Sequence, residues 1–132
     1  MTAVPLATLP GRPCPIAAAL ELVGERWALL VVREIALGAT HFGDIVRGTG
    51  APRDRIAARL KALEAAGVVV RTPYQDNPPR HAYGLSDSGR ALVPVLQALL
   101  TWGEVHAVSP TDPDRPRRYP PLSESARAKE NR

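Results

Sequence analysis

The chain has 132 residues, a mass of 14.2 kDa, 45% hydrophobic residues and a formal net charge of +4. This length fits one domain with an ordinary hydrophobic core. A single cysteine, Cys14, excludes an intrachain disulfide and a zinc site built from paired Cys-x-x-Cys elements, which favours a reducing compartment. The longest apolar run, WALLVV, is too short to cross a bilayer, and the beginning of the chain lacks the pattern of a signal peptide. We therefore expect a cytoplasmic protein without a membrane partner.

The positive charge is unevenly distributed. Residues 14–108 contain ten Lys or Arg and nine Asp or Glu, so this region carries a net charge of only +1. Within it, residues 47–61 contain five basic side chains and a single acidic one, Asp54. A local basic cluster of this kind indicates where an anionic partner would bind more clearly than the total charge does. The five basic residues are Arg47, Arg53, Arg55, Arg59 and Lys61.

Proline separates a central domain from two flanking segments. Nine of the fourteen prolines precede Ile16 or follow Val108. The last segment also has few apolar residues to offset the conformational entropy of its chain. We predict a disordered N-terminal arm at residues 1–13, a domain at 14–108 and a disordered Pro/Arg-rich tail at 109–132. Arg115, Arg117 and Arg118 of the tail could add non-specific affinity for an anionic partner.

Three helices are predicted in the first half of the domain. Residues 16–23 carry apolar side chains at helical spacing after Pro15, which suits the first helical position. Residues 26–37 are apolar nearly all round and predict the central buried helix. Thr40 is expected to cap a short third helix at residues 41–47.

A fourth helix is predicted at residues 52–66, beginning at Pro52 after the turn GTGAP. Its buried stripe is expected to consist of Ile56, Leu60 and Leu63. Small residues follow an arginine on the opposite face, and Arg59 lies at the border between the two faces. A helix that enters a groove benefits from such a smooth face. The face contains Arg55, Ala58, Ala62 and Ala65.

A β-hairpin is predicted to follow, with strands at residues 68–74 and 80–85 and a tip at QDNPP. Pro73 cannot donate to a strand ladder, so the hairpin is expected to be an edge element. The tip prolines limit its freedom and reduce the entropy that it would lose on docking.

A single closing helix is predicted at residues 87–106, with Ser86 as its N-cap. Pro94 lies inside this helix and removes one backbone hydrogen bond, so a kink is expected there. Its aromatic residue Trp102 lies on the apolar stripe. We expect four aromatic residues to be core residues, namely Trp27, Phe42, Tyr83 and Trp102.

The order of these elements predicts a winged helix-turn-helix. The third and fourth predicted helices would form the helix-turn-helix, whose second member enters the major groove of DNA. The hairpin would form the wing, with Arg80 and His81 placed to meet phosphates or the adjacent minor groove. The motifs of phosphate loops, nucleophilic serines and zinc proteases are missing, so an enzyme is not expected.

Six short motifs follow one another over about residues 14–103. They are Cys14-Pro15, GERWALLVVREIALG, FGDI, RIAARLKALEAAGVVVR, PPRHAYGLSDSGRAL and LLTWG. In this order they resemble the HxlR family of bacterial regulators, a branch near the MarR-like proteins. The resemblance implies an α+β winged helix-turn-helix with a two-stranded β wing and N- and C-terminal dimerisation helices. It also implies a homodimer that binds double-stranded DNA.

Carried over by position, the family's DNA-reading helix corresponds to residues 53–66 and its wing arginine to Arg80. The implied DNA-binding residues are Arg53, Arg55, Ala58, Arg59, Arg80 and His81. Ala51 and Pro52 occupy the turn in which many relatives have a hydroxyl N-cap, so the start of this helix is expected to be weakly capped.

Cys14 allows two interpretations. It can be a small, half-buried apolar residue near the dimer interface, or a redox-sensing thiol, as the resemblance implies for some members. The three histidines lack metal-ligand spacing, and we predict no metal or cofactor. A small-molecule effector pocket between the dimer helices has no recognisable polar signature in the sequence.

These observations predict a transcriptional regulator that binds a pseudo-palindromic operator as a homodimer, and the resemblance favours a repressor. Redox or effector control would act on this binding. The alternative is a winged-helix protein–protein interaction module, in which the alanine face of the fourth helix docks on a protein. The arginines at the start of that helix favour DNA.

Overall fold

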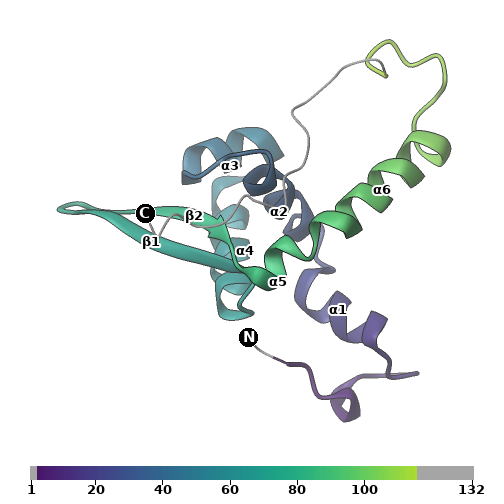
Figure 1. Ribbon diagram of the computed structural model, residues 1–132, viewed down its shortest axis with the longest axis horizontal. Coiled ribbons are helices and arrows are strands. Elements are labelled where there is room, and N and C mark those ends of the chain that lie inside the picture. The colour runs from purple at the N-terminus through teal and green to yellow at the C-terminus, as the bar shows by residue number, and fades with distance from the viewer. Residues whose placement is uncertain (1–2, 116–132) are drawn as a thin grey trace.

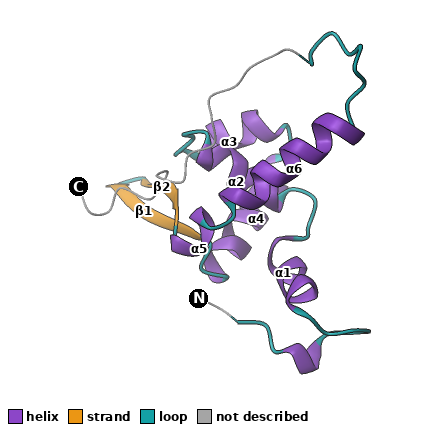
Figure 2. Cartoon of the chain, turned by 45° about the vertical axis from the view of Figure 1, so that its right-hand side comes forward, coloured by secondary structure: helices purple, strands orange, loops and turns teal. Residues whose placement is uncertain are grey.

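A computed structural model of the protein describes residues 3–115, in which helices and a two-stranded antiparallel sheet follow the predicted order (Figure 1). The β-hairpin extends from one side of the helical body, and helices α1 and α6 lie at the opposite side (Figures 1 and 2). The elements are α1 (Pro15–Val23), α2 (Ala28–Ala36), α3 (Phe42–Thr49), α4 (Arg53–Ala65), β1 (Val69–Asp76), β2 (Pro79–Leu85), α5 (Asp87–Arg90) and α6 (Val93–His106).

The predicted flanking segments are described only in part. A short 3-10 helix, Leu6–Thr8, has no buried residue and precedes α1. Arg117 and Arg118 of the predicted tail lie outside the described residues. The predicted disorder of residues 1–13 and 109–132 stays a prediction.

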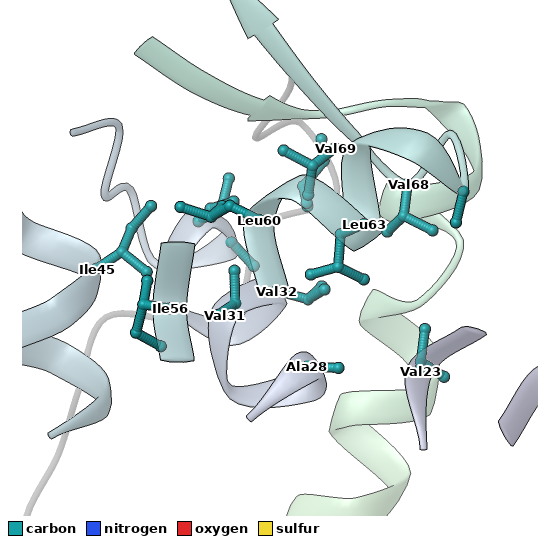
Figure 3. Close-up of a cluster of buried hydrophobic side chains, with 14 of the residues drawn as sticks. Val23, Ala28, Val31, Val32, Ile45, Ile56, Leu60, Leu63, Val68 and Val69 are labelled. Carbon is teal, nitrogen blue, oxygen red and sulfur yellow. The ribbon is translucent and has the colours of Figure 1, made fainter. Parts of the chain in front are cut away.

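Helix α2 is the centre of the core, as predicted, because helices α3, α4 and α6 and strand β2 all pack against it. Val31 of α2, Ile45 of α3 and Ile56 of α4 are completely buried and lie close together (Figure 3). The predicted buried stripe of α4, which also includes Leu60 and Leu63, is confirmed. Replacing Ile56 by alanine is expected to lower the free energy of unfolding by about 2–5 kcal/mol.

The turn between α3 and α4 is tight. Gly50 adopts a φ of 72°, the left-handed conformation that favours glycine at the end of a helix. Pro52 is the N-cap of α4 and supplies no side-chain hydrogen bond, so the weak capping predicted for this helix is confirmed. The prediction that Thr40 caps α3 is wrong, because the N-cap is His41. Thr40 has another role, since its carbonyl accepts a hydrogen bond from the Tyr83 N–H at 2.7 Å.

The wing is longer at its tip than predicted. The ladder continues beyond Tyr74, because Gln75 pairs with Arg80 and Asp76 pairs with Pro79. A register shift between Pro73 and Gln75 accommodates Tyr74, and the turn is reduced to residues 77 and 78. Pro73, which cannot donate to a ladder, lies on a sheet of two strands and therefore on an edge, as predicted.

The prediction of one closing helix with a kink at Pro94 is wrong. The chain forms two helices, α5 and α6, which are separated at residues 91 and 92. Pro94 lies in the first turn of α6, where its missing N–H leaves no intrahelical hydrogen bond unmade. Ser86 caps α5 as predicted, because its hydroxyl accepts a hydrogen bond from the Gly89 N–H at 3.2 Å.

Helices α1 and α6 expose apolar side chains. The prediction that Trp102 is a core residue is wrong within one chain, because 61% of its surface is exposed. Helix α6 packs on the core through Val93 and Leu96, which turns the neighbouring positions outward. Trp27, Phe42 and Tyr83 pack against the core as predicted. The exposed apolar face contains Ile16, Leu20, Val95, Leu99, Leu100, Trp102 and Val105.

Candidate nucleic-acid interface

The N-terminal half of α4 presents basic side chains to solvent. Arg53, Arg55 and Ala58 are all exposed, whereas Ile56 on the opposite side of the helix is buried. Burial of the apolar stripe therefore sets the rotation of α4, and this rotation places Arg55 and Ala58 on one accessible face. These are three of the predicted DNA-binding residues, and their contact with DNA stays a prediction.

Arg59 has a different environment. Its Nε lies 3.1 Å from Oε2 of Glu25 in the turn before α2, and both side chains are about two-thirds covered. The same carboxylate oxygen accepts a hydrogen bond from the Trp27 N–H at 3.1 Å. The structure thus separates Arg59 from the exposed arginines of α4. Glu25 was missed in the sequence because the two residues meet only through the packing of α4 near the start of α2.

Within residues 3–115, three arginines at the start of α4 and on the wing lack an acidic partner, as do Arg12 and Arg26 outside these elements. Among the described residues, five arginines form ion pairs with acidic side chains. Arg55 and Arg80 form none, and the guanidinium carbon of Arg53 instead lies 4.8 Å from the centre of the Phe42 ring. Their positive charges remain available to an anionic partner. The five paired arginines are Arg33, Arg47, Arg59, Arg71 and Arg90.

A partly open cleft of about 400 Å³ lies where the start of α3, the start of α4 and the wing meet. Arg53, Arg80 and His81, three of the predicted site residues, line it together. His41 and Tyr74 also line it, with their ring centres 5.0 Å apart in an edge-to-face arrangement. No pattern in the sequence indicates these two residues, because 33 positions separate them and only the return of the wing toward α3 brings them together.

Tyr83 lies at the base of this cleft, where the wing joins the body. Burial of its ring raises the pKa of the hydroxyl above the ordinary value of 10.0. The positive charge of Arg71 opposes this shift, and the negative charge of Glu64 adds to it. The hydroxyl of Tyr83 is therefore a neutral group at the edge of a positively charged surface.

Cys14 lies far from this cleft along the chain, at the N-cap of α1. It is a free, half-buried cysteine, and its side chain makes no capping hydrogen bond. Within residues 3–115 no group of three or more His, Cys, Asp or Glu side chains could hold a metal ion. No helix in this range is long and apolar enough to cross a membrane.

Two helices joined by a tight turn and followed by a two-stranded wing define a winged helix-turn-helix protein. The model of the HxlR-like helix-turn-helix family matches residues 22–110, and the chain belongs to this family. The resemblance described from the sequence is therefore confirmed.

Relatives with the same architecture are described as transcriptional regulators. The chain is 40% identical over 108 residues to Rv3095 of Mycobacterium tuberculosis, an uncharacterised HTH-type transcriptional regulator, covering 82% of this chain and 68% of Rv3095. The crystal structure of PA1607, described as a transcription factor, has a TM-score of 0.70 at 37% identity and covers 75% of this chain and 69% of that one. The oxidised form of HypR, a redox regulator, has a TM-score of 0.62 at 30% identity, and the match covers 73% of this chain and 100% of HypR.

Proposed function

We propose that this protein is a sequence-specific transcriptional repressor that binds a pseudo-palindromic operator as a homodimer. One observation carries this proposal: Arg53 and Arg55 at the start of α4 and Arg80 on the wing are exposed and lack acidic partners among the described residues. The other arginines of the helix-turn-helix and the wing, Arg47, Arg59 and Arg71, have acidic partners. Unpaired arginines on a helix that follows a tight turn are suited to base edges and phosphates. The role of relatives as transcriptional regulators supports the same function.

Arg55 is our candidate for reading bases. It is exposed, it lies within the first turn of α4, and the small side chain of Ala58 follows it on the same face. The N-terminal residues of a recognition helix contact base edges in the major groove. A bidentate arginine–guanine contact contributes about 1–3 kcal/mol of discrimination.

The exposed apolar face of α1 and α6 supports a homodimer. It lies at the opposite side of the body from the wing, so a second copy bound there would leave both wings free (Figures 1 and 2). Apolar patches of this kind mark protein interaction sites. Two copies of α4 would then enter successive major grooves, with half-site centres about 10 bp apart or a multiple of this spacing.

Redox control through Cys14 forms part of the proposal. Cys14 lies at the start of α1, beside the exposed apolar face that would form the dimer. The structural neighbour HypR is described as a redox regulator. In this chain two Cys14 thiols, one from each protomer, would lose two protons and two electrons to an oxidant and form one disulfide bond.

The first experiment measures fluorescence anisotropy on DNA from upstream of the protein's own gene and neighbouring genes, with scrambled duplexes of equal length as the control. Specific regulators typically prefer their site by at least about 10³-fold, with a steep dependence on salt. Equal and weak binding to both duplexes would contradict the proposal. It would favour a protein–protein interaction module, for which the exposed Ala58 and Ala62 of α4 provide a smooth surface.

A further inference from the structure

The cleft between α3, α4 and the wing is lined by two arginines and two histidines. Arg53 reaches it from α4, Arg80 and His81 from β2, and His41 from the N-cap of α3. No carboxylate is among the described residues that line it. Asp44, the nearest acidic residue along α3, pairs with Arg47. The cleft thus combines two permanent positive charges with two imidazole rings and would attract an anion.

We propose that this cleft binds one DNA backbone phosphate in each half-site through Arg53, Arg80 and His41. We call this phosphate-binding site the phosphate seat. This inference rests on the proposed function, and it divides the arginines of α4 into two roles. Arg53, held over the ring of Phe42, binds the backbone, whereas Arg55 on the open face reads bases.

The parts of the seat are held in place before any ligand arrives. The hydrogen bond from the Tyr83 N–H to the Thr40 carbonyl ties β2 to the segment before α3. The edge-to-face contact between Tyr74 and His41 holds β1 against the same segment. Groups that are already oriented lose less conformational entropy when they bind, so a fixed seat increases affinity.

The position of His41 is set by its neighbour. The hydroxyl oxygen of Thr40 lies 3.0 Å from Nδ1 of His41. A hydroxyl that donates to Nδ1 leaves the ring proton on Nε2, and that nitrogen can then donate to a phosphate oxygen. Thr40 was expected to cap α3, and its position beside the imidazole gives it a part in this seat.

A duplex is favoured as the source of the phosphate because the cleft is open and borders the exposed start of α4. Contacts to the backbone fix the register of a recognition helix in the groove, and they come from residues that flank its N-terminus. A seat shared by the helix and the wing would fix both elements on one strand. Free inorganic phosphate carries the same chemistry and is tested as a competitor.

The test replaces single operator phosphates with uncharged methylphosphonates and measures affinity by anisotropy. In the wild type, neutralising one particular phosphate in each half-site is expected to weaken binding by about threefold or more. In His41→Ala and Arg80→Ala, the same neutralisation should weaken binding by a smaller factor than in the wild type, because only two of the three phosphate-binding groups remain. Arg80→Lys, which keeps the charge, should retain part of the wild-type response. Arg71→Ala is the matched control, because Arg71 is an exposed wing arginine that pairs with Glu64 and does not line the cleft.

Salt dependence supplies a second readout that does not require an operator. Each lost phosphate contact lowers the slope of log K against log salt by about 1 on any duplex. The affinity of Arg80→Ala should therefore depend less steeply on salt, on operator and scrambled DNA alike. The slope of Arg71→Ala should equal that of the wild type. Thermal unfolding followed by circular dichroism confirms that the variants are folded.

The outcomes separate this inference from the proposed function. Neutralisation effects as large in His41→Ala and Arg80→Ala as in the wild type, with unchanged salt slopes, overturn the phosphate seat alone. Displacement of wild-type protein from DNA by inorganic phosphate, without any sensitive backbone position, also overturns it and identifies a small-anion site. If the wild type binds operator and scrambled DNA equally, while its salt slope stays steeper than that of Arg80→Ala on every duplex, the proposed function is overturned and the phosphate seat is retained.

Discussion

The guanidinium Nε of Arg59 in α4 lies 3.1 Å from a carboxylate oxygen of Glu25 in the turn before α2. This pair joins the helix that would read DNA to the start of the central helix. The same carboxylate oxygen accepts a hydrogen bond from the Trp27 N–H, so Glu25 contacts both α4 and the N-cap residue of α2. We propose that Arg59 positions α4 through this pair, and its predicted contact with DNA stays a prediction.

A double-mutant cycle tests this role of Arg59. If Arg59 positions α4 through Glu25, then Arg59→Ala and Glu25→Ala should weaken operator binding by similar factors, and the double variant should be no weaker than either. The partly exposed pair should contribute only about 0–1 kcal/mol to the free energy of unfolding. Urea denaturation and anisotropy on the same samples provide the two measurements. A loss confined to Arg59→Ala would instead assign a DNA contact to Arg59.

The exposed face of α6 predicts a dimer that a single charge can disrupt. Leu99 is 49% exposed in one chain, so Leu99→Arg should leave the monomer folded. A buried, unpaired charge in the interface would separate the protomers. Sedimentation velocity should show the change from dimer to monomer. Gln97→Arg, at another exposed position of the same helix, should remain dimeric, and a dimeric Leu99→Arg would exclude this face as the interface.

Oxidation provides a separate test of the protomer arrangement. Treatment with diamide should produce a covalent dimer on non-reducing gels. Cys14 is the single cysteine of the sequence, so its thiol can form a disulfide only with another molecule. The thiols lose two electrons to diamide, which is reduced to the hydrazine. Cys14→Ser should stay monomeric on the same gels. A wild-type protein that remains monomeric after full consumption of its thiol would argue against paired Cys14 residues.

Tyr83 predicts a loss of stability at alkaline pH. Its folded-state pKa is raised by burial above about 10, the value expected in the unfolded chain. The folded state therefore binds the hydroxyl proton more tightly than the unfolded chain does. The contribution of this hydroxyl to the free energy of unfolding is fully present below pH 10 and disappears as the pH rises through the folded-state pKa. Urea denaturation at pH 9 and pH 11 should show a smaller loss for Tyr83→Phe than for the wild type. Equal losses would contradict the assigned role of Tyr83.

The sequence allowed the fold to be predicted because local signals and the hydrophobic pattern agreed. The stripe of Ile56, Leu60 and Leu63 determined how α4 would rotate, and its exposed face followed from helical geometry. Pro94 was misread because a proline inside an apolar stripe indicates either a kink or a new first turn. Trp102 was misread because an apolar stripe buried within its own chain and an apolar stripe exposed on the surface have the same periodicity.

The site was predictable only where it is local. Arg53, Arg55 and Ala58 belong to one helix, so their common exposure followed from its period. The Glu25–Arg59 pair and the His41–Tyr74 contact depend on how α4 and the wing pack against the rest of the chain. Periodicity within one element carries no information on such contacts, and they were therefore missed.

The role of α4 in reading DNA is tested most directly by the ratio of operator to scrambled-duplex affinity in Arg55→Ala, measured by anisotropy beside the wild type and Arg71→Ala. We expect Arg55→Ala to lose about 1–3 kcal/mol of discrimination, which is roughly a 5- to 150-fold smaller ratio, and to keep its affinity for scrambled DNA. Arg71→Ala should keep the wild-type ratio. An unchanged ratio in Arg55→Ala, or a wild-type ratio near one, would contradict the account of α4 as the helix that reads the operator.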